Sequence, residues 1–200
     1  ISLAGGRLLR FDAASINVGI SSGPADVPGF AEHGIPAKPL DRFADAWAVT
    51  DRKDPIAVLG GGGGGCELAM AMAHARGSGT GITVIDQAQV LGTLPQREAI
   101  LKQMAAMRIA VLEQVEAVEV TGDAVILSDA THVASGFTVG AAGARLAGWL
   151  GKTGLDLHSD GSLTIGPTLQ TSDPAIFAAG DCAHMTQTPR PKAGVFAVRQ

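Results

Sequence analysis

The pattern of apolar and polar residues predicts alternating short strands and helices in the middle of the chain. Residues 56–59 and 82–85 are largely apolar runs with the length of a buried strand, and the Ala/Met/Leu-rich segment 66–73 predicts a helix between them. The alternation continues with a helix at 96–107 and strands at 110–112 and 137–139. Such an order of elements predicts an α/β domain with a mostly parallel sheet.

The flanking regions show shorter patterns. The expected elements there are strands at 7–12, 13–20, 163–165 and 175–179, an antiparallel ribbon formed by 115–120 and 124–127, and helices at 40–49 and 192–200. Residues 30–40 contain two prolines and are expected to be irregular. On the helix at 40–49, Phe43 and Trp47 are four residues apart and therefore share one face. The polar joint at 51–55 predicts a domain boundary.

Composition narrows the class of protein. The 200 residues are 46% hydrophobic and 17% charged, which suffices for a buried core. A net charge of −4 and an aromatic content of 4% argue against nucleic acid as the main partner. No apolar run reaches the roughly 18 residues that a membrane span needs, and no signal peptide is visible. The two cysteines, Cys66 and Cys182, form no C-x-x-C pair, which is compatible with the cytoplasm.

A run of six glycines separates the first predicted strand of the central unit from its helix. Gly60, Gly62 and Gly65 fit the pattern G-x-G-x-x-G, in which the first glycine turns the chain, the second admits a pyrophosphate and the third lets helix and strand pack closely. With Gly63 and Gly64 they lead into the helix, whose N-terminus attracts phosphate. The alternative is a flexible glycine linker, but linkers are not normally framed by two buried strands.

An acidic residue follows the second strand at the distance that this motif requires. Asp86 lies 21 residues after Gly65, close to the spacing at which a carboxylate binds the adenosine ribose of a dinucleotide. Gln87 comes next, and no arginine is adjacent to hold a 2′-phosphate. The sequence therefore favours NADH over NADPH.

A second motif lies near the end of the chain. Residues 171–181, TSDPAIFAAGD, resemble the T-x-x-x-x-I-[FY]-A-x-G-D signature of the pyridine nucleotide-disulfide oxidoreductases and the single-subunit NADH dehydrogenases. The resemblance implies that Gly180 and Asp181 approach the ribityl chain of FAD, where a carboxylate accepts a hydroxyl hydrogen bond. The alternative is an ordinary strand followed by an aspartate turn.

The resemblance covers nearly the whole chain and implies further site residues. Glu67 occupies the position of an acidic residue early in the nucleotide-binding helix, and Gly143 ends a segment that has Ala142 where the family usually has threonine. Lys192, Ala193 and Gly194 resemble the flavin-facing helix start of NADH-dehydrogenase-like proteins that are sometimes fused to selenide, water dikinase. The family's first G-x-G-x-x-G motif for FAD and its C-terminal domain have no counterpart in this sequence, so it is expected to be a fragment of a longer protein.

The predicted fold is a Rossmann-like, three-layer NAD(P)-binding domain, residues 51–155, inserted in an FAD-binding domain to which residues 1–50 and 156–200 contribute. The predicted function is an enzyme, an FAD-dependent oxidoreductase that passes hydride from NADH to the flavin and on to an unknown small-molecule or protein acceptor. The alternative is an NAD-binding or regulatory module without turnover. The expected cofactor-binding residues are Gly60, Gly62, Gly63, Gly64, Gly65, Glu67, Asp86, Gly143, Gly180, Asp181, Lys192, Ala193 and Gly194.

Some roles stay open at this stage. No side chain is assigned as a general acid or base. Glu67 either lies near the nicotinamide or favours the first helical turn through the helix dipole. The five histidines show no metal-ligand spacing, so no metal site is expected. A homo-oligomer formed through the missing C-terminal domain is compatible with the resemblance.

Overall fold

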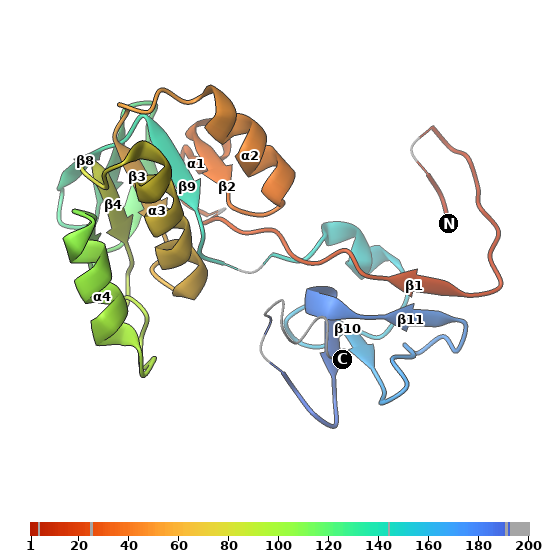
Figure 1. Cartoon of the computed structure of the whole chain (residues 1–200). Helices are drawn as coiled ribbons and strands as arrows, with labels where there is room; N and C mark the ends of the chain where they lie inside the picture. The colour runs from red at the N-terminus through yellow and green to blue at the C-terminus, as the bar shows by residue number, and fades with distance from the viewer. Residues whose placement is uncertain (4, 25, 144, 191, 193–200) are drawn as a thin grey trace. The chain divides into compact units, whose positions relative to one another are not determined.

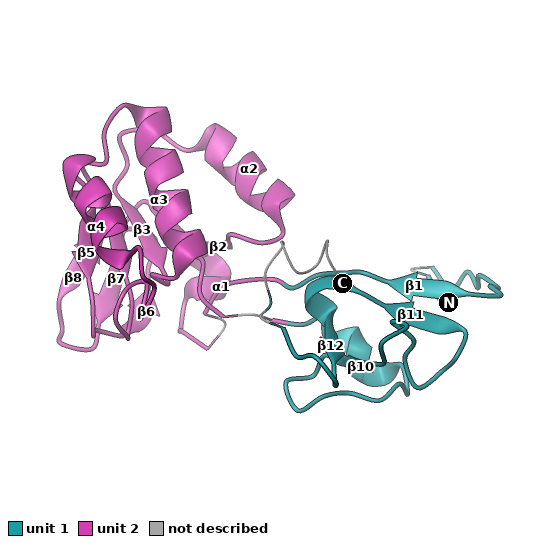
Figure 2. Ribbon diagram, turned by 60° about the horizontal axis from the view of Figure 1, so that its bottom comes forward, with its two compact units in different colours: residues 1–20, 146–200 teal, residues 21–145 magenta. Residues whose placement is uncertain are grey.

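The computed structural model describes residues 1–3, 5–24, 26–143, 145–190 and 192. The chain forms two compact units, one of residues 21–145 and one of residues 1–20 together with 146–200 (Figure 2). Residues 21–50, which the sequence analysis grouped with residues 1–20, therefore pack with the glycine run instead. The assignment of the two units to NAD(P) and FAD stays a prediction.

A five-stranded, fully parallel sheet forms the centre of the larger unit (Figure 1). Its order is β2-β9-β3-β4-β5. The strands are β2 (Gly34–Pro36), β3 (Ile56–Leu59), β4 (Ile82–Ile85), β5 (Ala110–Leu112) and β9 (Phe137–Gly140). The chain runs from β3 outward to β4 and β5 and then returns to the other side of β3 as β9. The predicted strands are confirmed, and the sheet reverses its order between β3 and β9.

Two layers cover the sheet. Helices α2 (Leu40–Val49), α3 (Gly63–Arg76) and α4 (Arg97–Ala106) pack on the face to which Ile56 and Val58 point. The other face, which carries Ala57 and Leu59, packs against the antiparallel sheet β6 (Ala117–Val120), β7 (Ala124–Leu127) and β8 (His132–Ala134). Because all four residues of β3 are buried, the strand reads as a continuous apolar run. The predicted three-layer α/β fold is confirmed.

Aromatic side chains fix α2 on this unit. Phe43 and Trp47 lie on one face of the helix, as predicted, and both contact Phe137 of β9, with ring centroids 6.2 and 5.8 Å apart. The pairs are tilted, an arrangement worth about 0.5–1.5 kcal/mol beyond burial. A short helix, α1 (Phe30–His33), precedes β2 and buries Phe30 against the opposite face.

Some elements differ from the prediction. Residues 7–12 form no strand, since Leu8 makes only an isolated bridge with Ser2. Residues 30–40 were expected to be irregular because they contain Pro36 and Pro39, but the pairing of β2 with β9 overrides this local preference. Strand β8 was not predicted. Helix α3 begins at Gly63 rather than after the glycine run.

The smaller unit is built from two parallel strand pairs. Strand β1 (Ala14–Ile16) pairs with β11 (Ile176–Ala178), and β10 (Leu163–Ile165) pairs with β12 (Ala183–Met185). The 3₁₀ turns η1 (Gly148–Lys152) and η2 (Gly180–Cys182) complete it, and Leu150, Leu163, Ile165 and Cys182 are buried in its core. The predicted helix at 192–200 lies outside the described residues, apart from Lys192.

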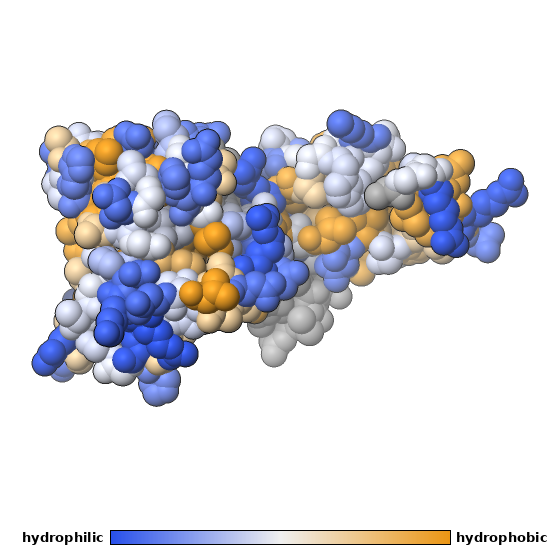
Figure 3. Space-filling view, turned by 90° about the horizontal axis from the view of Figure 1, so that it is seen from above, coloured by the Kyte–Doolittle hydropathy of each residue, from blue (hydrophilic) through white to orange (hydrophobic). Residues whose placement is uncertain are grey.

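Hydrophobic residues on the face seen in Figure 3 form separate patches interrupted by hydrophilic residues. Exposed large apolar side chains occur in both units, for example Leu8 at 75% and Val49 at 86% exposure. In the part of the chain that the structure describes, no helix combines the length and the hydropathy that crossing a membrane requires.

Candidate nucleotide-binding site

The glycine run forms the junction between β3 and α3. Gly60 has φ of 110° and donates its N–H to the carbonyl of Ile85 at 2.8 Å. Gly62 is the N-cap residue in extended conformation, and the first helical hydrogen bond runs from the Cys66 N–H to the Gly62 carbonyl at 3.1 Å. The first-turn N–H groups have no intrahelical partner, and no side chain caps them. Together with the helix dipole, these donors suit a phosphate.

Two of the glycines are required by close packing. A methyl group on Gly60 would lie 2.5 Å from both the Cβ and the N of Ala142, which follows β9. A methyl group on Gly65 would overlap the Gly60 carbonyl oxygen and lie 3.3 Å from the Cβ of Ala141. The start of α3 therefore touches the end of β3, as expected for the third glycine of the motif.

Three glycines between Gly60 and Gly65 are exposed to solvent. Gly62, Gly63 and Gly64 are exposed, and a methyl group on any of them would meet no atom within 4 Å. Their backbone is thus free of protein neighbours on the side where a side chain would point. The run combines two packing positions with an uncovered stretch of backbone at the helix start.

Asp86 lies beside this turn. It follows β4 directly, is half-buried, and its Oδ2 accepts a hydrogen bond from the Gly61 N–H at 2.5 Å. Its Oδ1 accepts one from the Ala88 N–H at 2.7 Å. A carboxylate has about four acceptor positions, so two remain for hydroxyl donors of a ligand. The structure thus places the predicted ribose-binding residue within hydrogen-bonding distance of the glycine turn.

A cavity of about 300 Å³ opens at the carboxyl ends of β3 and β4. Gly60, Asp86 and Gly143 line it, together with the two further carboxylates Asp26 and Glu116. In α/β sheets, ligands bind outside the carboxyl ends of the strands where the strand order reverses. The cavity occupies such a position, because the chain reverses between β3 and β9.

The loop after β4 is tied to the turn by residues that the sequence analysis did not place in the site. Val90 is fully buried and packs against Gly61, and the Leu91 N–H donates to the Gly61 carbonyl at 2.7 Å. Arg97 donates from Nε to the Val90 carbonyl at 2.9 Å and pairs through Nη2 with Glu113 at 2.5 Å. The Glu113 carboxylate also accepts the Val90 N–H at 2.9 Å.

The Arg97 side chain is only 23% exposed, and its partner Glu113 lies 16 residues later in the sequence, after α4 and β5. No local helical spacing could have indicated this pair. The ion pair clamps the loop at Val90, which in turn holds Gly61.

Glu67 does not line the cavity. It is exposed and lies in the second turn of α3, because the helix already begins at Gly63. Of the two roles considered from the sequence, a contribution to the first helical turn is therefore wrong. The other role, proximity to a nicotinamide, stays a prediction.

The second group of predicted residues lies in the smaller unit. Gly180 has φ of 74° and opens η2, and Asp181 is buried at 8% exposure. The Lys192 ammonium donates to the Ala183 carbonyl at 2.8 Å. Ala193 and Gly194 lie outside the described residues. The structure therefore brings Gly60, Gly62, Gly63, Gly64, Gly65, Asp86 and Gly143 together in one unit and Gly180, Asp181 and Lys192 in the other.

The geometry defines a dinucleotide-type α/β domain, and comparison with known families makes the assignment specific. Residues 3–200 match the family model described as pyridine nucleotide-disulphide oxidoreductase. The chain belongs to this family. No curated protein matches the chain by sequence at a significant level.

Solved structures share the fold. An FAD-dependent pyridine nucleotide-disulphide oxidoreductase from Desulfovibrio vulgaris superposes with a TM-score of 0.82 at 23% identity, over 98% of this chain and 54% of that one. A ferredoxin reductase of the CYP199A2 system from Rhodopseudomonas palustris gives 0.79 at 22%, over 97% and 51%. An NAD-dependent persulfide reductase from A. fulgidus gives 0.76 at 19%, over 96% and 38%. The chain thus spans about half the length of these proteins or less.

Proposed function

We propose that this chain is the pyridine-nucleotide-binding part of an FAD-dependent NADH oxidoreductase. The observation that carries the proposal is the convergence of an uncovered helix start, at Gly62, Gly63 and Gly64, with the Asp86 carboxylate at the carboxyl edge of the sheet. Pyrophosphate needs N–H donors without side chains in the way, and ribose needs an acceptor beside them. The larger unit supplies the N–H donors after β3 and the carboxylate acceptor after the adjacent strand β4.

The charge of the cavity supports NADH over NADPH. Asp26, Asp86 and Glu116 line it, and none of its described lining residues is a lysine or arginine. A 2′-phosphate bound near Asp86 would meet like charges, whereas a 2′-hydroxyl can donate to the carboxylate. At about 4 Å two unit charges interact by roughly 1 kcal/mol in water and about 4 kcal/mol near a protein surface, so tenfold discrimination or more is expected.

The two cofactors would supply the chemistry, hydride from NADH and a flavin that passes electrons to an acceptor. This chain's own part is to bind and orient. In addition to the residues of the larger unit, Gly180, Asp181, Lys192, Ala193 and Gly194 are proposed to contact FAD, on the resemblance of their motifs. The buried Asp181 beside the positive-φ Gly180 fits a hydrogen-bond acceptor presented by a tight turn. No residue of this chain is proposed to transfer a proton.

The acceptor is proposed to be a small molecule or a protein. One similar structure, at 22% identity and a TM-score of 0.78, is a covalent complex of putidaredoxin reductase with putidaredoxin. Another, at 20% identity and 0.76, is a water-forming NADH oxidase from Lactobacillus brevis bound to NADH. They represent the two kinds of acceptor.

Calorimetric titration of the 200-residue chain with NADH and with NADPH tests the proposal. We expect saturable NADH binding, NADPH binding at least tenfold weaker, and a loss of about 10–100-fold in NADH affinity for Asp86→Ala, the value of a hydrogen bond to a charged group. Glu98→Gln is the matched control, since it removes an exposed negative charge on α4 that does not line the cavity. The pair Asp26→Asn and Glu116→Gln should raise NADPH affinity.

The outcomes separate the candidate functions. No binding of either nucleotide by a folded chain, or an unchanged affinity in Asp86→Ala, would overturn the proposal. Binding of NADH with no flavin reduction, once the chain is joined to a complete FAD-binding domain of a family member, would favour a nucleotide-binding module without turnover.

A further inference from the structure

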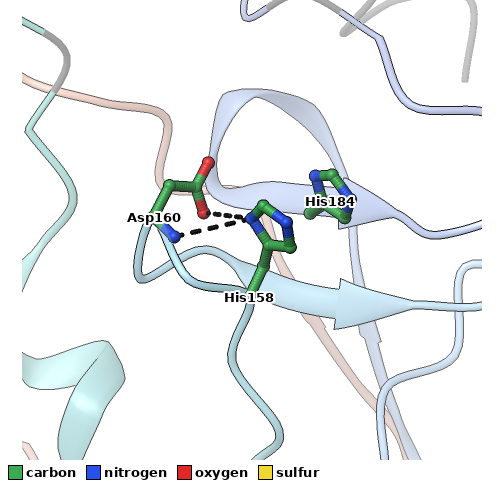
Figure 4. Close-up of side chains that lie close together, drawn as sticks. All are labelled: His158, Asp160 and His184. Atoms are coloured by element: carbon green, nitrogen blue, oxygen red, sulfur yellow. Dashed lines mark hydrogen bonds and ion pairs between the residues drawn. The ribbon is translucent and has the colours of Figure 1, made fainter.

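A cluster of two histidines and an aspartate lies in the smaller unit, on residues that the proposed function does not use (Figure 4). His158 and Asp160 belong to the turn that leads into β10, which the His158 N–H closes by donating to the Ser162 carbonyl at 2.8 Å. His184 is the central residue of β12 and stands opposite Thr164 of β10. The parallel pairing of β10 with β12 therefore brings together residues 26 positions apart in the sequence.

The three side chains are close enough to share one ion. Each offers one ligand atom, and these atoms lie within 4.8 Å of one another. The imidazole rings are stacked, with centroids 3.6 Å apart and planes inclined by 6°. Figure 4 shows Asp160 on one side of the His158 ring and His184 on the other. Ligands of a tetrahedral ion at about 2.0–2.2 Å are separated by roughly 3.5 Å, so side-chain rotation without movement of the strands can bring these atoms to one ion.

The aspartate holds one histidine in place. Asp160 Oδ1 lies 3.1 Å from His158 Nδ1 and accepts the Ser162 N–H at 2.9 Å and the Ser162 hydroxyl. The Asp160 N–H also lies 3.5 Å from His158 Nδ1, so the backbone and the carboxylate of Asp160 both contact this nitrogen and Nε2 is the one left for a metal ion.

The second histidine comes from the neighbouring strand. His184 lies on β12, and its ring stacks on that of His158, which puts the two imidazoles side by side. Metal ions bind the neutral imidazole, so metal binding and protonation compete for the same nitrogen. Lys192 is the one opposing charge in the described surroundings, with its ammonium 3.8 Å from Asp160 Oδ2.

We propose that His158, Asp160 and His184 form a binding site for a divalent transition-metal ion of the Zn²⁺, Ni²⁺ or Cu²⁺ class. The two imidazoles are ligands, the carboxylate orients His158 and supplies negative charge, and water completes the coordination. Imidazole selects these ions over Mg²⁺ and Ca²⁺, which prefer oxygen ligands. An ion cannot lie in the planes of both stacked rings, so binding turns one ring out of the stack.

Zn²⁺ titration of the full 200-residue chain by calorimetry, with Co²⁺ absorption to report the ligand type, tests the site. We expect one ion per chain and at least a tenfold loss of affinity in His158→Ala and in His184→Ala. Asp160→Asn should lower affinity about tenfold, the usual cost of removing the partner of a metal-bound histidine. His132→Ala is the matched control, because His132 is exposed in the other unit and is expected to leave affinity unchanged.

A gain-of-affinity variant keeps the proposal falsifiable if the histidine variants do not fold. Lys192→Met removes the opposing charge and no ligand, and we expect it to strengthen Zn²⁺ binding about fivefold. In the wild-type chain, Zn²⁺ should shift the imidazole proton resonances of His158 and His184 as the stack opens. Absence of Zn²⁺ binding, an equal loss in His132→Ala, or an unchanged affinity in Lys192→Met would overturn the assignment.

Discussion

Replacement of single glycines in the run separates their packing roles from their ligand-facing roles, and Gly65→Ala is the most informative change. Gly65 lies in the first turn of α3, where alanine would normally gain up to about 1 kcal/mol in helix propensity. Its new methyl group, however, would overlap the Gly60 carbonyl oxygen and lie 3.1 Å from the Gly60 carbonyl carbon. These atoms are backbone and cannot rotate away.

The magnitude follows from what must move. Relief of the overlap requires α3 to shift from the end of β3, which disturbs the packing of the fully buried Ala69 and of Met72. Overpacking of a core costs about 1–3 kcal/mol, and a clash with rigid backbone belongs at the upper end. After the propensity gain is subtracted, we expect Gly65→Ala to lose about 2 kcal/mol. For a unit of this size, that lowers Tm by about 8 °C.

Gly64→Ala is the matched control. Gly64 is the preceding residue of the same helical turn, but a methyl group there meets no atom within 4 Å. We expect this variant to gain about 0.5–1 kcal/mol from the lower entropy of its unfolded chain. Thermal melts followed by far-UV circular dichroism and urea midpoints measure both. Equal Tm changes for the two variants, or a Gly65→Ala chain as stable as wild type, would refute the packing argument.

Other perturbations test the remaining features. Arg97→Met and Glu113→Gln should each lower NADH affinity several-fold and lower the free energy of unfolding by about 1–3 kcal/mol, because each leaves a half-buried partner unpaired. In chemical denaturation the double variant should lose less than the sum of the two single losses. Additive losses would contradict the role of the Arg97–Glu113 ion pair in holding the loop. Ser135→Ala should cost about 1–3 kcal/mol, since the buried hydroxyl accepts the Ala57 N–H at 3.1 Å; unchanged hydrogen exchange of that amide would contradict it. Burial, aided by two nearby carboxylates, raises the pKa of Cys66 to about 11, so alkylation of the thiol should be slow in the native state at pH 9 and fast in urea. The free energy of unfolding should fall as pH rises from about 9 to 11, because only the unfolded thiol ionises in that range. Fast native alkylation at pH 9 would refute this.

The central strands could be predicted because burial on both faces makes them continuous apolar runs. Strand β2 could not, since its three residues pair with β9, which lies far away in the sequence. Strand β8 also has three residues and was missed although it pairs with the preceding strand β7. Strand β2 contains Gly34 and Pro36, which locally favour a turn, but its register with β9 supplies hydrogen bonds that a turn would lack. The start of α3 was also hidden, because glycines carry no side chain to mark a helix boundary.

The candidate nucleotide site could be predicted in part. Asp86 was found because its spacing from Gly65 follows from one strand–helix–strand unit of fixed size. The ion pair of Arg97 with Glu113 depends on how α4 returns to β5, and no periodic pattern encodes it. The pairing of His158 with His184 likewise depends on the parallel alignment of β10 with β12. Histidine spacing along the sequence therefore carried no signal for this cluster.

The six glycines at 60–65 have two different roles, which depend on what surrounds each of them in the fold. Gly60 and Gly65 are fixed by contacts with Ala142 and with each other, and Gly61 is enclosed by Val90 and the Asp86 carboxylate. All three are buried, so they set the distance between β3, β4, the segment after β9 and the start of α3. At the remaining glycines, Gly62, Gly63 and Gly64, an added methyl group would meet no atom within 4 Å, and they present bare backbone at the helix start. The buried glycines hold the exposed ones at the point where the sheet reverses its order. A substitution of a buried glycine should therefore change both stability and nucleotide affinity, whereas a substitution of Gly62, Gly63 or Gly64 should change affinity without loss of stability.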